Sequence, residues 1–221
     1  VEVDWAGAIV PIHDTVTGET SKAYLFVGCL PFSRYSFVHA TGDMRESSWL
    51  DCHVLMFGYF GAVPARIVCG NLKTGVVSHP RDGEIVLNDH YRNLAEHYST
   101  AVLPGRVKKP KDKPSGENLV LHAERAVIGA MRDREFHSLD ELNLAIREWL
   151  DAYNAAPFRK REGSRLASFE SEERPAMIPL PAVPYETGEW VGSRKVTGDC
   201  HIVYKRNRYS VPHRLAGRRV E

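Results

Sequence analysis

The chain has 221 residues, of which 43% are hydrophobic and 26% are charged, and its formal net charge is +1. This composition is that of an ordinary globular protein, long enough to bury a sizeable core in one large domain or in one domain with a smaller companion. The nearly neutral balance does not by itself indicate nucleic-acid binding, so any basic surface must be local.

The cysteines and the apolar runs further narrow the class of protein. Four scattered cysteines show no CxxC spacing, which argues against a zinc site and indicates reduced thiols in a cytosolic protein. No apolar run approaches the ~20 residues of a membrane helix and no signal peptide is visible, so we expect no membrane partner. The chain does not begin with Met and opens directly in a predicted strand, so we expect a piece of a longer protein.

The first seventy residues predict an antiparallel meander, then a helix and a fourth strand. The expected strands are residues 1–10 (ending near 11–13), 22–30, 34–41 and 65–69, and the expected helix is 46–60. The long connection through the helix favours a parallel return of the fourth strand beside the first.

The following residues predict three more helices and a short strand. The expected elements are a helix over 88–98, a strand over 100–103, a helix over 117–134 and a helix over 138–154. Asn88 is the expected N-cap of the first of these helices, and Ser138 with Glu141 forms a capping box at the last.

Two carboxylates stand out from this pattern. Asp4 is a single carboxylate in an apolar, β-rich strand, where burial is costly unless it pairs with a backbone donor or with a divalent cation. Glu117 begins a helix after a loop, residues 104–114, that holds five basic residues and one acid. A Glu in a first turn is commonly structural, because the helix dipole favours it there, and a lysine-rich loop is commonly a solvated linker.

From residue 157 the composition changes. Residues 157–184 hold five of the thirteen prolines and predict an extended linker. Beyond it, short strands are expected over 189–196, 201–205 and 208–212, with a basic hairpin turn over 205–208. Residues 189–221 hold eight Lys or Arg against three acids, a net charge of +5. This charge suits a surface that contacts DNA phosphates, and it is also compatible with an ordinary solvated hairpin.

Five segments in order resemble the integrase core of the IstA-type insertion-sequence transposases, members of the DDE transposase and retroviral-integrase superfamily. They are residues 3–7 around Asp4, residues 64–76, residues 109–117 leading to Glu117, residues 158–165 and residues 209–212. The resemblance implies an α/β, RNase H-like core, with a mixed five-stranded sheet flanked by helices, followed by a small β-barrel. The implied domains are a catalytic core over 1–156, a Pro-rich linker over 157–184 and a basic barrel over 185–221.

The resemblance also implies the chemistry. It implies a transposase that binds transposon-end DNA and catalyses 3′-end processing and strand transfer with two Mg²⁺ ions, for which Mn²⁺ is a workable substitute. Asp4 and Glu117 would be metal ligands, because hard cations prefer carboxylate oxygens. None of the ten histidines is assigned to the metal.

One position departs from the family pattern. Gly70 occupies the position of the second catalytic Asp, 47 residues before Glu117. Glycine has no side chain that could bridge two metal ions, and Asn71 is a weak neutral substitute. Two interpretations stay open: the residue was altered to trap a DNA complex without reaction, which we favour, or this copy is naturally inactive.

The resemblance further implies partners. These are an AAA+ ATPase (IstB-like) that selects target DNA and further transposase copies, as a dimer or tetramer on paired ends, in the nucleoid-associated cytoplasm of a bacterium. The expected DNA contacts are Lys73, Lys108, Lys109, Lys111, Lys113, Arg125, Arg194, Lys195, Lys205, Arg206 and Arg208. Two other classes stay open: a catalytically dead DNA-binding or assembly module, which Gly70 would favour, and an RNase H-like nuclease, against which the basic tail argues.

Overall fold

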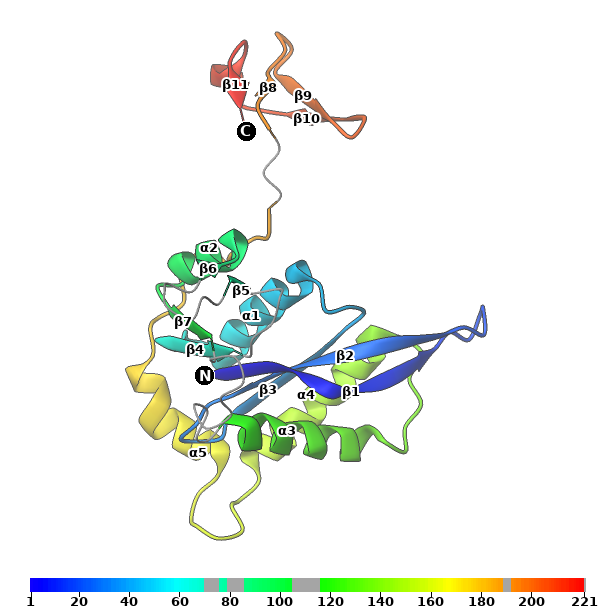
Figure 1. The fold of residues 1–221 in the computed structure, drawn as a ribbon, viewed down its shortest axis with the longest axis vertical. Coiled ribbons are helices and arrows are strands. Elements are labelled where there is room, and N and C mark those ends of the chain that lie inside the picture. The colour runs from blue at the N-terminus through cyan, green and yellow to red at the C-terminus, as the bar shows by residue number, and fades with distance from the viewer. Residues whose placement is uncertain (70–75, 79–85, 105–115, 189–191, 221) are drawn as a thin grey trace. The chain divides into compact units, whose positions relative to one another are not determined.

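The computed structural model of the chain divides into two compact units, Val1–Tyr185 and Glu186–Glu221. It describes residues 1–69, 76–78, 86–104, 116–188 and 192–220, and for residues 76–78, 86–87, 104 and 116–119 it describes the backbone alone. Figure 1 shows the elements of both units, coloured from the N-terminus to the C-terminus.

Five strands form the central sheet of the first unit, in the order β3-β2-β1-β4-β7 (Figure 1). Their bounds are β1 Glu2–His13, β2 Thr20–Cys29, β3 Ser36–Thr41, β4 Arg66–Cys69 and β7 Ala101–Pro104. Strands β1, β2 and β3 pair antiparallel, whereas β4 pairs parallel with both β1 and β7. The predicted meander and the predicted parallel return of the fourth strand beside the first are both confirmed.

Helices cover both faces of this sheet. The main helices are α1 Glu46–Phe60, α2 Asp89–His97, α3 Gly116–Met131 and α4 Leu139–Ala155, and a small hairpin is formed by β5 Val76–Ser78 and β6 Val86–Leu87. As predicted, Asn88 caps α2 and Ser138 caps α4, each through its side-chain oxygen. The Glu141 carboxylate accepts from the N–H of His137, one residue before the position that a capping box requires.

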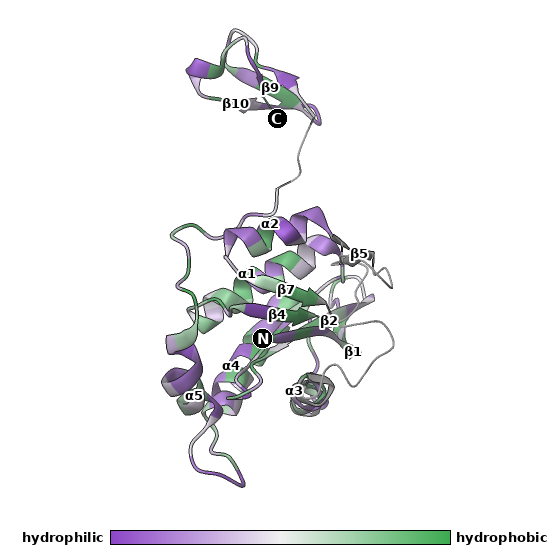
Figure 2. Ribbon diagram, turned by 60° about the vertical axis from the view of Figure 1, so that its left-hand side comes forward, coloured by the Kyte–Doolittle hydropathy of each residue, from purple (hydrophilic) through white to green (hydrophobic). Residues whose placement is uncertain are grey.

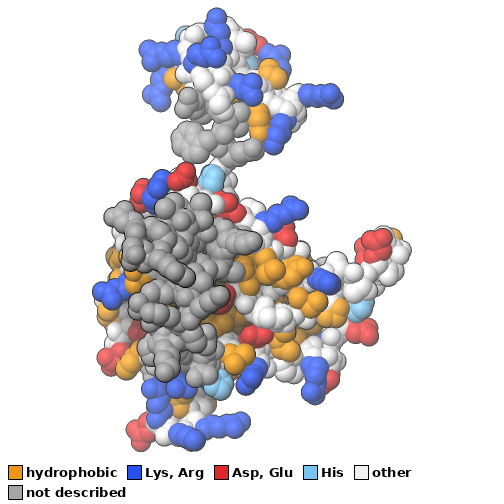
Figure 3. All heavy atoms as spheres, in the orientation of Figure 1, with side chains coloured by type: hydrophobic (Ala, Val, Ile, Leu, Met, Phe, Trp, Pro, Cys, Tyr) orange, Lys and Arg blue, Asp and Glu red, His pale blue; other side chains and the backbone are white. Residues whose placement is uncertain are grey.

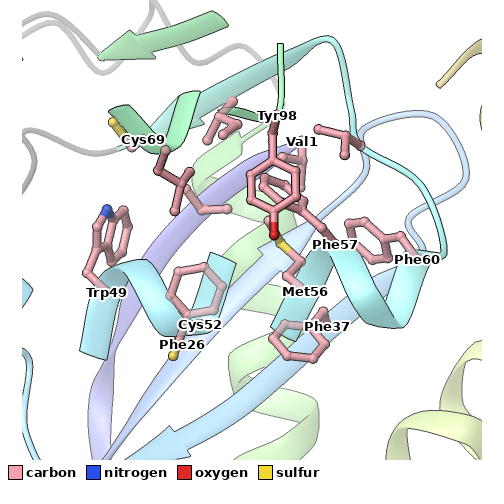
Figure 4. Close-up of a cluster of buried hydrophobic side chains, with 14 of the residues drawn as sticks. Val1, Phe26, Phe37, Trp49, Cys52, Met56, Phe57, Phe60, Cys69 and Tyr98 are labelled. Carbon is pink, nitrogen blue, oxygen red and sulfur yellow. The ribbon is translucent and has the colours of Figure 1, made fainter. Parts of the chain in front are cut away.

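The α1 face of the sheet buries an aromatic core (Figure 4). The ring of Trp49 in α1 lies 5.1 Å from that of Phe26 in β2 and 5.7 Å from that of Trp5 in β1, measured between centroids. Gly28 lets α1 approach this closely, because a Cβ atom there would collide with the sulfur of buried Met56. Large rings of this kind supply much of the burial energy of a small domain.

The opposite face is covered by α3 and α4, and its core is mainly aliphatic. Ala6 and Val10 of β1 share one buried cluster with Ala123 and Val127 of α3. Figure 2 shows α3 almost along its axis, beside the strands that it covers. The sheet is therefore sandwiched between an aromatic layer and an aliphatic layer.

Two asparagines of α4 cover the outer edge of β3. The Asn154 amide accepts from the N–H of Ser36 at 3.1 Å and donates to the carbonyl of the same residue at 2.8 Å. Asn143 makes the same pair of bonds with Ala40, at 2.8 and 2.9 Å. The two amides take the place of a neighbouring strand at these two residues, so the outward backbone groups of Ser36 and Ala40 are satisfied.

Residues 157–184, which we expected to be a linker, pack against the core of the first unit. They contain α5 Arg165–Ser168 and two short helical turns, Phe169–Glu173 and Arg174–Ala176. Phe169 is 3% exposed and stacks on Tyr35 with centroids 4.3 Å apart, and the Glu173 carboxylate accepts from the N–H groups of residues 32 and 33. Proline spacing indicated the extended stretches, but it carried no information on these distant partners.

In the second unit, for which we expected a small barrel, the described strands pair in two small sheets. β8 Arg194–Lys195 pairs with β11 Arg219–Val220, and β9 His201–Tyr204 pairs with β10 Asn207–Ser210. β9 and β10 form the predicted basic hairpin. Its turn residues Lys205 and Arg206 have φ values of 46° and 69°, the left-handed region that a type I′ hairpin turn requires.

All four cysteines are free thiols. Burial raises the pKa of Cys29 to about 11 and raises that of Cys52 further, so neither thiol ionises near neutral pH. Across the part of the chain that the structure describes, no helix combines the length and the apolar character of a membrane span.

Candidate catalytic edge of the sheet

Asp4 lies in β1 with its side chain on the face that α3 covers. Its neighbours Val3 and Trp5 are buried in the aromatic core on the α1 face, and side chains alternate along a strand. Ala6, the next residue on the face of Asp4, is buried in the aliphatic core. Asp4 itself is half-buried, and its Oδ1 accepts from the N–H of Trp5 at 2.9 Å. The carboxylate is therefore held by the backbone where the aliphatic core meets solvent.

The end of β4 lies beside this carboxylate. In the parallel pairing of β1 with β4, Glu2 is in register with Val68 and Val3 with Cys69. Asp4 is the next residue of β1 after this register pair, and Cys69 is the last residue of β4. Gly70, the position at which the resemblance implies a second acidic residue, lies outside the described residues.

Glu124 fixes α3 against β1 at an irregularity of the strand. The pairing of β1 with β2 is regular up to Trp5 and resumes at Ile9, with a bulge between them. Within the bulge, the N–H of Ala8 donates to Oε1 of Glu124 at 3.1 Å. Bulges re-aim a strand locally, and here the bulged N–H bonds to a helix side chain.

α3 runs in the same direction as β1 (Figure 1). Its middle is tied to Ala8 through Glu124, and the carbonyl of Phe136, beyond its end, accepts from the N–H of the last residue of β1. Counting back, the helix rises about 10 Å from Glu124 to residue 117, and the strand spans about 13 Å from Ala8 to Asp4. The backbone of α3 at residue 117 thus runs back toward the Asp4 end of β1.

Several predicted site residues belong to segments that the structure does not describe. Gly70, Lys73, Lys108, Lys109, Lys111 and Lys113 lie outside the described residues, as does the side chain of Glu117. Among the described residues, no group of three or more His, Cys, Asp and Glu could hold a metal ion. Of the acidic side chains predicted for the site, that of Asp4 is the one described.

The remaining residues predicted to contact DNA are exposed. They are Arg125 in α3 and Arg194, Lys195, Lys205, Arg206 and Arg208 in the second unit. The guanidinium group of Arg208 forms an ion pair with Asp199, which offsets its charge. The Lys205 ammonium group lies 4.9 Å from the ring centroid of Tyr204. The basic character of the hairpin therefore rests mainly on its two turn residues.

Two features were not assigned a role from the sequence. Glu124 follows Glu117 by seven residues, a spacing that places both on one side of a helix, so a signal was present. The α4–α5 turn, residues 157–165, holds Arg159-Lys160-Arg161 beside an aromatic residue, and this segment was used only for its resemblance. The contact partner of Glu124 lies 116 positions away in the sequence, whereas the contacts of the turn are local.

The fold is that of a retroviral-integrase core. The HTLV-2 integrase catalytic core domain, solved in complex with magnesium, matches 74% of this chain and 93% of its own, with a TM-score of 0.50 and 14% identity. A chain of the simian T-cell lymphotropic virus intasome, solved in complex with the PP2A regulatory subunit B56 gamma, matches 98% of this chain and 78% of its own, with a TM-score of 0.53 and 14% identity. At this identity the likeness concerns the fold alone.

Sequence comparison finds relatives over nearly the whole chain. Residues 180–221 match the family model "Mu transposase, C-terminal domain". Two relatives, each named as a putative transposase, are y4bL/y4kJ/y4tB of Sinorhizobium fredii, 42% identical over 98% of this chain, and that of insertion sequence IS1162 of Pseudomonas fluorescens, 37% identical over 99%. The chain spans 42% and 39% of their lengths. It is thus related to the transposases of bacterial insertion sequences over nearly its whole length, which confirms the resemblance inferred from its sequence.

Proposed function

We propose that the chain is the catalytic core segment of a DNA transposase, which binds transposon-end DNA and joins its 3′ ends to target DNA. The observation that carries this proposal is the placement of Asp4. It is half-buried, lies on the α3 side of β1 and directly follows the residue in register with Cys69. Carboxylates that converge at such an edge suit phosphoryl transfer, and the names of the relatives support the same class of reaction.

Asp4 and Glu117 are the residues that would hold Mg²⁺, or Mn²⁺ in its place. Carboxylate oxygens are the ligands that these hard cations prefer. Two bound Mg²⁺ ions would stabilise the attacking and the leaving oxygen of an in-line displacement at phosphorus. The bond from the Trp5 N–H orients Asp4, and the bond from Ala8 to Glu124 supports the helix that carries Glu117.

Gly70 would leave this site short of one ligand. Because a missing side chain cannot be replaced by a neutral neighbour, we expect the chain to bind DNA but to join it poorly. Gly70 also favours a second candidate function, a DNA-binding or assembly module that keeps the fold and lacks the chemistry. DNA binding would survive in either case, since it depends on basic surfaces and not on position 70.

The second unit and several partners complete the proposal. Lys205 and Arg206 would contact phosphates from the hairpin turn, and Arg194 and Lys195 from β8, without reading sequence. An IstB-like AAA+ ATPase would select the target, and two or four transposase copies would assemble on paired ends in the bacterial cytoplasm. These partners are proposed from the resemblance.

The proposed test is a strand-transfer assay on pre-cleaved transposon-end duplexes with Mg²⁺, performed in the full-length protein. We expect joining by the Gly70→Asp variant and little by the Gly70 protein, with DNA binding equal in both. Adding Asp4→Asn to the Gly70→Asp variant should abolish joining again. If the Gly70 protein joins DNA as well as the Asp variant does, position 70 is not a metal ligand and the assigned triad is wrong. If the Asp variant binds transposon ends but never joins them, the second candidate function, a DNA-binding or assembly module, describes the protein better.

A further inference from the structure

The α4–α5 turn is a basic surface that the proposed function leaves unused. It holds four Lys or Arg and one Glu. Arg159, Lys160 and Arg161 are exposed, and none of the three forms an ion pair with another described residue. Figure 3 shows Lys and Arg side chains gathered over this turn, at the lower end of the first unit. Three consecutive cations without an acidic partner among the described residues form a site for a polyanion.

Backbone contacts close the turn at both ends. Pro157 and Ser164 form an antiparallel bridge, and the N–H of Phe158 donates to the carbonyl of Gly163 at 2.9 Å. Gly163 has a φ of 83°, a conformation that suits glycine. Ser164 also caps α5 by accepting from the N–H of Ala167 at 3.1 Å. The cations therefore project from an ordered loop, and less ordering is needed when they bind.

Aromatic rings hold two of the arginine side chains in place. The Cζ atom of Arg161 is 3.8 Å from the ring centroid of Phe158, and Cζ of Arg165 is 3.9 Å from that of Tyr153. Arg165 also lies 5.6 Å from the Phe158 ring and donates to the carbonyl of Tyr153 at 3.0 Å. A guanidinium group stacked on a ring keeps the N–H edge that pairs with phosphate, and it loses less side-chain freedom on binding.

The turn lies at the Asp4 end of the sheet. α5, which follows the turn, leads directly into Phe169, whose ring stacks on that of Tyr35, and the Tyr35 carbonyl accepts from the N–H of Leu30, the residue after the end of β2 at Cys29. Cys29 is in register with Glu2, which precedes Asp4 by two residues and so shares its face of β1. A polyanion that reaches the Asp4 carboxylate would therefore pass close to the turn.

We propose that the α4–α5 turn is a second DNA contact, in which Arg159, Lys160 and Arg161 bind backbone phosphates of duplex DNA lying along the Asp4 edge. Phe158 sets the position of Arg161 and contributes no base readout. The inference rests on the proposed function, because that function supplies DNA as the ligand. The contact is independent of sequence, since a phosphate carries no base information.

The test compares duplex binding by the chain and by the R159A/K160A/R161A variant over a series of salt concentrations. The probe is a duplex of unrelated sequence of about 30 base pairs, roughly three helical turns. Because each phosphate contact contributes about 0.9 to the slope of log K against log salt, we expect the slope to fall by about 2 to 3. The matched control is K22A/R132A/R134A, which removes the same charge at the opposite end of β1. Its slope should stay within about 0.5 of the unaltered chain.

Two further variants test the details. R159K/R161K keeps both charges and should keep the salt slope, so a fall there would contradict a phosphate contact based on charge. Phe158→Leu should weaken binding only a few-fold, because it releases Arg161 without removing its charge. Equal slopes for the turn variant and the control variant would overturn this inference and leave the proposed function standing, since the unaltered chain would still bind. If the unaltered chain binds no duplex at any salt concentration, the proposed function and this inference both fail.

Discussion

The two faces of the central sheet bury different kinds of side chain. On the α1 face, large rings such as Trp49 surround His53, which is enclosed completely. On the α3–α4 face the core is aliphatic, and polar side chains such as Asp4, Glu124 and Asn154 lie against strand backbone. Both faces bury apolar side chains, and the α3–α4 face in addition places several polar side chains against strand backbone. A carboxylate on a strand needs a backbone donor or solvent; at Asp4 the next residue of β1 supplies the donor, and partial exposure supplies the solvent.

The largest effect on stability is expected from a substitution that disrupts the aromatic core under α1. Phe57 of α1 is fully buried, with its ring centroid 4.7 Å from that of Tyr98. Phe57→Ala should lower the free energy of unfolding by about 3–5 kcal/mol, because it removes buried area and leaves a cavity. Leu55→Ala is the matched control in the same helix, since Leu55 is 42% exposed, and it should change stability by about 0.5 kcal/mol or less. Urea unfolding measures both, and equal costs would contradict the assignment of α1's buried face.

The second prediction concerns the pH dependence of the same face. Nδ1 of His53 donates to the Trp49 carbonyl at 2.8 Å, and Nε2 accepts from the Tyr91 hydroxyl at 3.1 Å. Burial lowers the pKa of His53 from 6.5 to about 4, so the unfolded state binds more protons between these values. The stabilisation is complete above pH 6.5 and is lost as the pH falls toward 4, by about 3 kcal/mol.

The measurement is the free energy of unfolding at several pH values from 4 to 7.5, for the chain and for His53→Gln. The variant is expected to be less stable at neutral pH and to show a shallower decline on acidification, because its amide does not titrate. Parallel curves for the two proteins would mean that His53 is not the group responsible for the acid sensitivity.

The third prediction tests how the asparagines of α4 close the outer edge of β3. Asn154→Ala leaves the N–H and carbonyl of Ser36 without partners in a buried environment, and it should cost about 2–3 kcal/mol. Asn143→Ala exposes the backbone of Ala40 at a part-buried position, where water can replace the amide, so about 1 kcal/mol is expected. A larger cost at Asn143 than at Asn154 would show that burial does not decide the difference.

The smallest expected effect on stability concerns Glu124. Glu124→Ala removes the acceptor for the Ala8 N–H in a part-buried bulge and should cost about 1 kcal/mol. Its effect on joining should be larger, about 10- to 100-fold in the Gly70→Asp protein, because α3 would sit less firmly against Asp4. Glu124→Gln keeps Oε1 as an acceptor and should restore most of the rate. If the alanine and glutamine variants join DNA equally well, the bond does not position the site.

The periodicity of apolar residues was sufficient to predict the helices and strands and part of their arrangement. The apolar spacing of residues 46–60 gave the bounds of α1, and the lengths of the connections gave the meander with a parallel fourth strand. Asp4 was recognisable because a carboxylate in an apolar strand is costly without a partner. The order of the matching segments gave the family, and the caps Asn88 and Ser138 marked two helix starts. All of these signals are local in the chain.

Tertiary structure alone decided three features, because each depends on residues far apart in the sequence. The prolines of residues 157–184 indicated a linker, but stacking of Phe169 on Tyr35 packs that segment against the core. The bond between Ala8 and Glu124 joins residues 116 positions apart. The side of the sheet on which Asp4 lies follows from the burial of its neighbours under α1. Local spacing determines which face of an element is apolar, whereas the element that covers that face is chosen by packing of the whole chain.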